Sequence, residues 1–350
     1  PIKLDFSPVR DSKHEGVAPY FRQVVEQDVK AWCKKRGLNI YKDGLKIYTT
    51  IDPTMQAYAE EAVQEQMKGK TRFANAKNWS KHKLTLNRSI KESERYRNLK
   101  AEGLSEEEIQ KNFNTKTAMK VFSWNAKKEK DTVITPLDSI KYMKGFVQAG
   151  FMAMDPATGE VKAWVGGINH KYFQYDHVNV NTKRQVGSTI KPLLYCLAVD
   201  NGYSPCQAIP LSKAFFPGHG WYGPDRNGGA MQMKMALAHS KNNATVNILK
   251  MVGIQHFVDF ARKLGITSYL HAYPSVCLGA DDISIIEMLR AYTMFPNYGI
   301  NTKPIYITRI EDRNGNLLEN FVPERNEVIN EITAFKMIRM MMGTVLFGTG

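Results

Sequence analysis

The stretch Gly187-Ser188-Thr189-Ile190-Lys191-Pro192 constrains this chain most, because it sets a hydroxyl and an amine three residues apart at a predicted helix start. The apolar run 193–199 follows directly and predicts a buried helix. Residues i and i+3 lie on the same face of a helix. A serine hydroxyl is a weak nucleophile until a neighbouring base takes its proton. Ser188 and Lys191 are therefore a candidate nucleophile and its base.

A lysine can act as a base near neutral pH only when its pKa falls well below the usual ~10.4, and burial is one cause of such a fall. The apolar run after Lys191 predicts that burial. The same S-x-x-K pattern occurs at Ser80-Lys81-His82-Lys83, where basic residues surround the motif and no apolar helix follows. A lysine there is expected to stay protonated, so the Ser188 motif is preferred.

A second candidate motif, Ser240-Lys241-Asn242, lies 52 residues after Ser188, between predicted helices at 233–240 and 244–251. A serine at this break can relay a proton to a leaving group, and the asparagine amide can hold a substrate backbone. Taken alone, Ser240 fits a simple helix cap equally well. The similar Ser123-Trp124-Asn125 lacks flanking apolar helices and is not preferred.

The remaining pattern predicts helices and strands in separate groups. Helices are expected at 24–35, 54–67, 254–264 and 281–292, and strands at 45–51, 151–154, 161–167 and 305–310. Between 68 and 130 the pattern weakens, and only a short helix at 105–113 is predicted, with Ser105 and Glu108 as a capping box. The mixture favours an α+β fold over a βαβ repeat.

The two motifs, in this order, resemble those of penicillin-binding proteins and serine β-lactamases. The segment 184–192 is similar to the R-Q-P-G-S-x-x-K-P of class A, bifunctional penicillin-binding proteins, with Val186 in place of the usual proline. Further segments of that family recur in order: Trp221-Tyr222-Gly223-Pro224, Ala236-Leu237-Ala238, Leu278-Gly279-Ala280 and Ala291-Tyr292-Thr293-Met294-Phe295. Residues 46–52 resemble the segment that joins its glycosyltransferase and transpeptidase domains. The resemblance covers 15–67 and 145–350.

The resemblance implies a penicillin-binding-protein/β-lactamase-like fold, an antiparallel sheet flanked by helices, with the C-terminal strands missing and a small linker or insert domain. It implies three parts in the 350 residues. Residues 1–50 are expected to be the end of a glycosyltransferase domain and its linker, and 51–144 a linker with a basic accessory insert. Residues 145–350 are expected to be a D,D-transpeptidase domain that stops before the K-T-G motif.

The function implied by the resemblance is peptidoglycan cross-linking. Ser188 would attack the penultimate D-Ala of a stem peptide and form an acyl-serine, and β-lactams would trap Ser188 as an ester. Lys191 would be the base and Ser240 a proton relay. Asn242 and Trp221 would bind substrate, and the N–H of Ser188 would give half of the oxyanion hole. No cofactor or metal ion is implied.

Two departures from the family limit this interpretation. No Lys-Thr-Gly or Lys-Ser-Gly occurs in the sequence, so we expect this chain to lack the group that binds the substrate carboxylate and completes the oxyanion hole. The glycosyltransferase domain would lie upstream of residue 1. The chain is expected to be a piece of a longer protein that is anchored in the membrane at its extracytoplasmic, or periplasmic, face.

The formal net charge of +14 is concentrated in one segment, because residues 67–130 hold 17 Lys or Arg against 7 Asp or Glu. This basic segment suits an anionic membrane surface or an anionic wall polymer, and a solvated face without a partner is an equal alternative. No nucleic-acid motif accompanies the charge, so nucleic acid is not expected as a partner. The four cysteines show no metal-binding spacing.

Two alternative functions share the first two motifs. A D,D-carboxypeptidase or a serine β-lactamase would end the reaction in hydrolysis, and a β-lactamase would turn penicillin over rather than keep it bound. A non-enzymatic sensor with the same fold would be acylated slowly by penicillin without transpeptidation. The resemblance of residues 46–52 to the interdomain segment favours the synthase.

Overall fold

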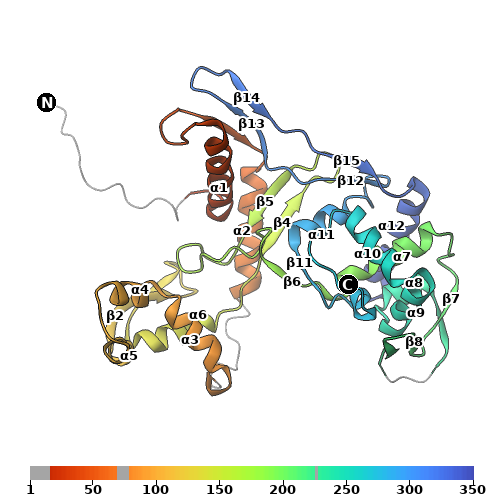
Figure 1. The fold of residues 1–350 in the computed structure, drawn as a ribbon, viewed down its shortest axis with the longest axis horizontal. Coiled ribbons are helices and arrows are strands. Elements are labelled where there is room, and N and C mark those ends of the chain that lie inside the picture. Colours follow the sequence, from red (N-terminus) through yellow and green to blue (C-terminus); the bar gives the residue numbers. More distant parts are fainter. Residues whose placement is uncertain (1–15, 69–78, 225–227) are drawn as a thin grey trace. The chain divides into compact units, whose positions relative to one another are not determined.

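The computed structural model describes residues 16–68, 79–224 and 228–350 (Figure 1). The chain divides into two compact units, each assembled from separate segments. The smaller unit contains 1–20, 57–151 and 165–177, and the larger unit contains 21–56, 152–164 and 178–350. In the part of the chain that is described, every helix is too short or too polar to cross a bilayer.

The smaller unit is more regular than the sequence predicted. Its elements are η3 (Trp79–His82), α3 (Lys83–Lys91), α4 (Glu94–Ala101), α5 (Glu106–Asn114), β2 (Thr117–Phe122), β3 (Glu129–Ile134) and α6 (Pro136–Lys144). Strands β2 and β3 pair antiparallel from Thr117↔Ile134 to Phe122↔Glu129. Ring contacts at 5.0 and 5.2 Å join the buried Phe122 to Phe146 and Phe173.

The capping box of α5 is confirmed, because Ser105 and Glu108 bond to each other's backbone N–H groups. The prediction that this is the only regular element between 68 and 130 was wrong, because η3, α3, α4, β2 and β3 lie there too. Its neighbours are short, and α4 buries no side chain, so little hydrophobic periodicity marks them in the sequence. Side-chain caps at Ser93 and Thr135 fix where α4 and α6 begin.

Helix α1 (Pro19–Arg36) packs on a three-stranded antiparallel sheet of the larger unit. The sheet has the order β1-β13-β14, formed by β1 (Lys46–Thr49), β13 (Ile307–Glu311) and β14 (Leu317–Asn320). Val29 and Cys33 of α1 are buried against Ile307 and Ile310. The strands predicted at 45–51 and 305–310 are thus confirmed, with shorter bounds.

The predicted hairpin at 151–167 is formed by β4 (Phe151–Met154) and β5 (Val161–Val165). Its turn is held by the carboxylate of Asp155, which accepts from the N–H groups of Ala157 and Thr158 at 2.8 and 3.0 Å. The side chain of Gln56, in α2 (Pro53–Lys68), bonds to both backbone groups of the buried Trp164. These bonds tie β5 to the start of α2.

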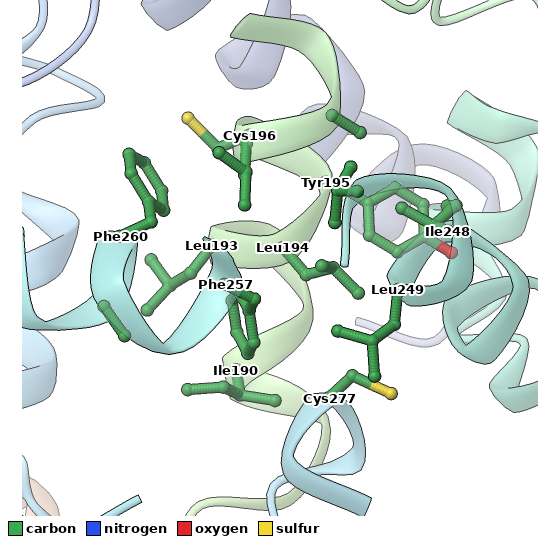
Figure 2. Close-up of a cluster of buried hydrophobic side chains, with 14 of the residues drawn as sticks. Ile190, Leu193, Leu194, Tyr195, Cys196, Ile248, Leu249, Phe257, Phe260 and Cys277 are labelled. Carbon is green, nitrogen blue, oxygen red and sulfur yellow. The ribbon is translucent and has the colours of Figure 1, made fainter. Parts of the chain in front are cut away.

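The core of the larger unit is a group of helices around α7 (Lys191–Asp200), as Figure 2 shows. The others are α8 (Met233–Ala238), α9 (Asn242–Val252), α10 (Ile254–Lys263), α11 (Ile285–Tyr292) and α12 (Glu331–Phe347), with short turns η4 (Gly187–Ile190) and η5 (Pro274–Leu278). Leu193, Leu194 and Tyr195 have no exposed surface. Each fully buried leucine contributes about 2 kcal/mol, which fixes α7 and whatever stands at its first turn.

Short strand pairs surround these helices: β6 (Lys183–Gln185) with β11 (Asp282–Ser284), β7 (Ala208–Pro210) with β10 (Ala230–Gln232), β8 (Ala214–Phe216) with β9 (Gly220–Tyr222), and β12 (Ile300–Thr302) with β15 (Arg325–Glu327). One helix prediction is corrected here. The helix expected from 281 begins at 285, because 282–284 pair with β6 and Ser284 caps α11.

Candidate active site

Ser188 is the second residue of η4, and the backbone before it depends on glycine. Gly187 has φ +56°, and its N–H donates to the carbonyl of Gly279 at 3.1 Å. A Cβ on Gly279 would lie 2.1 Å from the carbonyl oxygen of Gly187, so only glycine permits this approach. On the other side, the hydroxyl of Tyr292 donates to the carbonyl of Thr189 at 2.6 Å. These two contacts hold the exposed Ser188 in place.

Lys191 is the first residue of α7 and follows η4 without a break. Its side chain is only 1% exposed. The Nζ group donates to the carbonyl of Ser240 at 2.8 Å, to Ser240 Oγ at 3.0 Å and to Asn242 Oδ1 at 2.6 Å. A lysine ammonium has three N–H donors, so each donor has an acceptor here.

The predicted burial of Lys191 is confirmed, and its effect on the amine follows from the surroundings. Burial lowers the pKa of Lys191 from 10.5 to about 8, partly opposed by the thiol of Cys277. The three acceptors around Nζ are neutral oxygens, so no carboxylate among them restores the charged form. With a pKa of about 8, roughly one amine in ten is neutral at pH 7.

Ser240 lies between α8 and α9 and joins the other two side chains. Its Oγ donates to Ser188 Oγ at 3.0 Å and accepts from Lys191 Nζ at 3.0 Å. Its backbone has φ +50°, in the left-handed region that non-glycine residues rarely adopt. Ser240 is not the N-cap of α9, which is Lys241, but its backbone ends α8: its N–H donates to the carbonyl of Leu237 and that of Lys241 to the carbonyl of Ala236, both at 2.9 Å.

The structure therefore brings Ser188, Lys191, Ser240 and Asn242 into one hydrogen-bonded group. Sequence spacing suggested direct contact of Lys191 with Ser188, but in the described site the hydrogen bonds run from Lys191 to Ser240 and from Ser240 to Ser188. The reason is that all three N–H donors of Lys191 are turned toward the 240–242 segment. A proton can pass along this group, since each link is a hydrogen bond of 3.0 Å.

Trp221, the fifth candidate, lies in β9 and is 67% exposed. No hydrogen bond within the described residues joins it to the Ser188 group. Its ring packs on Phe215 with 5.5 Å between centroids. The hairpin that carries it is tied to α9 by Asn243, whose Nδ2 donates to the carbonyls of Leu211 at 2.6 Å and Pro224 at 3.2 Å.

Sequence reasoning missed two residues that shape the group, Asn243 and Cys277. Asn243 directly follows Asn242. A Cβ on Gly223 would lie 2.2 Å from Oδ1 of Asn243, so a glycine is needed there. Gly223 in the sequence was therefore a possible signal for this contact. Cys277 is fully buried in η5 and is electrostatically coupled to Lys191. Nothing in its sequence context signals that role.

The two competing motifs have different outcomes. Ser123 and Asn125 form the turn between β2 and β3, where Asn125 Nδ2 donates to the carbonyl of Glu129 at 2.7 Å. That motif is therefore a hairpin turn. Ser80 lies in η3, but its side chain is outside the described residues. The preference for the Ser188 motif therefore rests on the geometry at Ser188 alone.

Two family models match the chain. The model for the penicillin binding protein transpeptidase domain matches residues 149–350. The model for the penicillin-binding protein middle domain matches residues 59–147, a range that includes the basic segment outside the sequence resemblance. All four hydrogen-bonded candidates lie in the transpeptidase match.

Relatives of known name extend over much of the chain. Penicillin-binding protein 1A of Aquifex aeolicus is 29% identical over 347 residues, which covers 94% of this chain and 47% of that protein. Penicillin-binding protein 2D of Bacillus subtilis is 35% identical over 205 residues, which covers 56% of this chain and 30% of that protein. The chain spans half or less of the length of these curated relatives.

Solved structures share the fold. Penicillin-binding protein 1A from Haemophilus influenzae superposes with a TM-score of 0.65 at 18% identity, covering 96% of this chain and 59% of that one. The PonA1 protein from Mycobacterium tuberculosis, in complex with penicillin V, has a TM-score of 0.59 at 18% identity, covering 92% and 69%. These likenesses confirm the predicted α+β fold. Because the transpeptidase model matches more than half of the residues, this chain belongs to the penicillin-binding protein transpeptidase family.

Proposed function

We propose that this chain carries the cross-linking D,D-transpeptidase site of a peptidoglycan synthase, with Ser188 as its nucleophile. The observation that carries the proposal is the hydrogen-bonded series from Ser188 through Ser240 to a buried Lys191 whose pKa is lowered to about 8. This series supplies what an acyl-serine reaction needs: an exposed hydroxyl, a path for its proton and an amine that can accept it near neutral pH.

In the first half-reaction, neutral Lys191 takes a proton from Ser240 as Ser240 takes one from Ser188. The oxygen of Ser188 forms a bond to the carbonyl carbon of the penultimate D-Ala of a stem peptide. The backbone N–H of Ser188 stabilises the negative oxygen that develops. The carbon–nitrogen bond to the last D-Ala then breaks, and its nitrogen receives the proton back from Lys191 through Ser240. The product is an ester on Ser188.

In the second half-reaction, the amine of a neighbouring stem peptide attacks the ester carbonyl. The amine loses a proton along the same path, a new amide bond forms and the oxygen of Ser188 leaves as a hydroxyl. Asn242 is an exposed residue whose Oδ1 holds Lys191, and we assign its amide nitrogen to a substrate carbonyl. We place Trp221 beside it as a substrate contact.

The same attack would open the ring of a β-lactam and leave a slowly hydrolysed ester on Ser188. Two observations support this part of the proposal: the match to the penicillin-binding family, and the structurally similar PonA1 protein, which was solved with penicillin V. A hydrolase built on the same residues would release the opened β-lactam quickly, so the lifetime of the ester separates the two outcomes.

The test is covalent labelling with a fluorescent penicillin on a polypeptide extended past residue 350 to include a Lys-Thr-Gly strand. We expect a stable label, its loss in Ser188→Ala, and no change in the matched control Ser80→Ala. Label that survives Ser188→Ala would overturn the site. Rapid turnover of penicillin would instead favour the hydrolase.

We also propose the arrangement of the parent protein. Residues 1–50 would be the end of a glycosyltransferase domain and its linker, 51–144 a linker with the basic insert, and 145–350 the transpeptidase domain. The parent would polymerise glycan strands as well as cross-link them, and would be anchored in the membrane at its extracytoplasmic face. That this chain covers less than half of its relatives named penicillin-binding protein 1A supports a longer parent protein.

The basic segment 67–130 would hold the protein against anionic lipid headgroups or anionic wall polymer. It contains 17 Lys or Arg against 7 Asp or Glu. Binding of the chain to anionic vesicles and to wall sacculi is expected to weaken steeply as salt rises, since exposed charges are screened. Binding that is absent or independent of salt would dispose of this role.

A further inference from the structure

A cavity of about 530 Å³ opens between α1 and the segments 303–310 and 320–324, and we call it the α1 cavity. It lies wholly within the larger unit, and it shares no residue with the Ser188 group. Cavities that bind small molecules typically have volumes of about 300–1,000 Å³. The α1 cavity therefore has the size of a ligand site, and the proposed function leaves it without a role.

Much of the lining of the α1 cavity is apolar. Val29 of α1 and Ile310 of β13 line it and are 1% and 0% exposed. The half-buried rings of Trp32, Tyr306 and Phe321 line it as well. Burial of apolar surface against such side chains is favourable, and ring faces pack best on other rings. The lining thus suits a ligand with an apolar body that contains a ring.

Asp28 adds a negative charge to this apolar lining. Its carboxylate accepts from the hydroxyl of Tyr306, and burial together with this bond raises the pKa of Tyr306, so the phenol stays a neutral donor. Lys303 also lines the cavity, but it pairs with Glu324 at 3.8 Å. Among the described residues, no lysine or arginine pairs with Asp28. The charge of Asp28 is therefore the one that a ligand would balance.

Backbone hydrogen bonds fix the segment that forms one side of the α1 cavity. The carbonyl of Ile305 accepts from the N–H of Val161 at 2.9 Å, and the N–H of Ile305 donates to the carbonyl of Gly159 at 2.8 Å. The N–H of Thr50 donates to the carbonyl of Tyr306 at 3.2 Å. A ligand would meet a surface that is already ordered, which lowers the entropic cost of binding.

We propose that the α1 cavity binds a small molecule that combines one amine with an apolar, ring-containing body. The amine pairs with Asp28, and the body covers Val29 and Ile310. Charge complementarity selects this class of ligand, because an anion would meet Asp28 with the same sign. The volume favours a small molecule over a docked protein, which needs a broad face rather than a cavity.

The test is a ligand-detected NMR titration of the 350-residue chain with three indoles: tryptamine, tryptophol and indole-3-propionate. They share the same ring and two-carbon linker, and end in an amine, a hydroxyl and a carboxylate. Tryptamine is expected to bind about fivefold more tightly than tryptophol, on the scale of an exposed ion pair, and indole-3-propionate more weakly than both. The net charge of +14 would by itself favour the anion, so this order reports the local charge of the cavity.

Two substitutions of exposed residues should shift the affinity for tryptamine in opposite directions. Asp28→Asn removes the partner of the amine and should lower the affinity about fivefold, to that of tryptophol. Lys303→Gln removes a positive charge from the lining and should raise it about twofold. The matched control is Glu26→Gln on the same helix, because Glu26 pairs with Lys30 at 2.7 Å and does not line the cavity.

Indole-3-propionate that binds as tightly as tryptamine would overturn the proposal, and so would tryptamine binding that Asp28→Asn leaves unchanged. Absence of tryptamine binding at millimolar concentration would overturn it as well. A damaged fold cannot explain a gain of affinity in Lys303→Gln, so the two opposite shifts separate charge in the cavity from loss of structure. Since the cavity contains no residue of the Ser188 group, these results leave the acyl-serine proposal to its own test.

Discussion

Lys191 in the larger unit and Lys120 in the smaller unit carry the same amine in opposite surroundings. Lys191 is 1% exposed and meets only neutral oxygens, and burial lowers its pKa to about 8. The side chain of Lys120 is 60% exposed and meets the carboxylate of Glu129 at 3.1 Å. The hydrogen bond to Glu129 raises the pKa of Lys120.

The difference shows what converts a lysine from a surface cation into a base. Water around Lys120 solvates its charge, and a carboxylate stabilises it further, so the proton stays. Around Lys191 both stabilising influences are removed, while neutral acceptors still hold the amine in one position. The packing of α7 keeps water and carboxylates away from Lys191, and the 240–242 segment supplies the neutral acceptors that hold its amine.

The largest expected effect comes from removing the buried amine. Lys191→Ala should slow acylation of Ser188 by penicillin about a thousandfold, within the range that general-base catalysis contributes. Stopped-flow or timed labelling measures the rate, and Lys120→Ala is the matched control that should leave it unchanged. A Lys191→Ala rate within a few-fold of wild type would break the comparison.

Removing the bridging hydroxyl should have the next largest effect. Ser240→Ala keeps the backbone but interrupts the path between Ser188 and Lys191, so acylation should slow about a hundredfold. The control is Ser123→Ala, which alters the similar motif in the β2–β3 turn. Unchanged acylation in Ser240→Ala would mean that Lys191 takes the proton without this bridge.

Much of this contrast was predictable from residue pattern. The apolar run after Lys191 predicted burial, and the break between two helices predicted the place of Ser240, because both are local properties of the sequence. The contact between Ser240 and Ser188 was not, since it depends on how α7 and α9 pack and on a positive φ at a non-glycine residue. Cys277 was missed for the same reason, because it lies in η5, far along the chain from Lys191.

The smaller unit was predicted less well, for a different physical reason. Its helices are short and its strands lie on an exposed hairpin, so the periodicity of apolar residues is faint. Capping side chains such as Ser93 and Thr135 fix its elements, and caps are harder to recognise than apolar stripes. Among the elements between 79 and 144, α5, with its complete capping box, is the one that was found from the sequence.

A carboxylate placed beside Lys191 should make it resemble Lys120. In Asn242→Asp, the new charge would stand where Asn242 Oδ1 now accepts from Nζ at 2.6 Å, and it should raise the pKa of Lys191 above about 8. The base must be neutral to act, so the wild-type acylation rate should rise with pH up to about 8 and then level off. In the variant this rise should move to higher pH, with a rate at pH 7 about tenfold lower.

The pH profile of acylation is the measurement, and Asn242→Ala separates the loss of the amide from the gain of charge. If the profile of Asn242→Asp matches that of wild type, the apparent pKa does not belong to Lys191. A downward shift would contradict the assignment as well, because a nearby negative charge stabilises the protonated amine.

The smallest effect is expected from removing the charge of Glu129, the exposed partner of Lys120. Glu129 accepts from Lys171 at 2.6 Å, Tyr172 at 2.9 Å and Lys120 at 3.1 Å, and these bonds lower its pKa from 4.5 to about 2. Both lysines are more than half exposed, so water can solvate their charges almost as well as the carboxylate does. Glu129→Gln should therefore lower the unfolding midpoint at pH 7 only slightly, by about one or two degrees.

The sign of the pH and salt dependence makes this small effect diagnostic. A carboxylate with a lowered pKa stabilises the fold above its unfolded pKa of 4.5 and loses that contribution as pH falls toward 2, so wild type and Glu129→Gln should converge in that window. Screening in about 1 M salt should also remove the difference in stability between the two proteins at pH 7. A large loss of stability that persists in salt would mean that Glu129 is shielded from water. Exposure would then not explain why its lysines differ from Lys191.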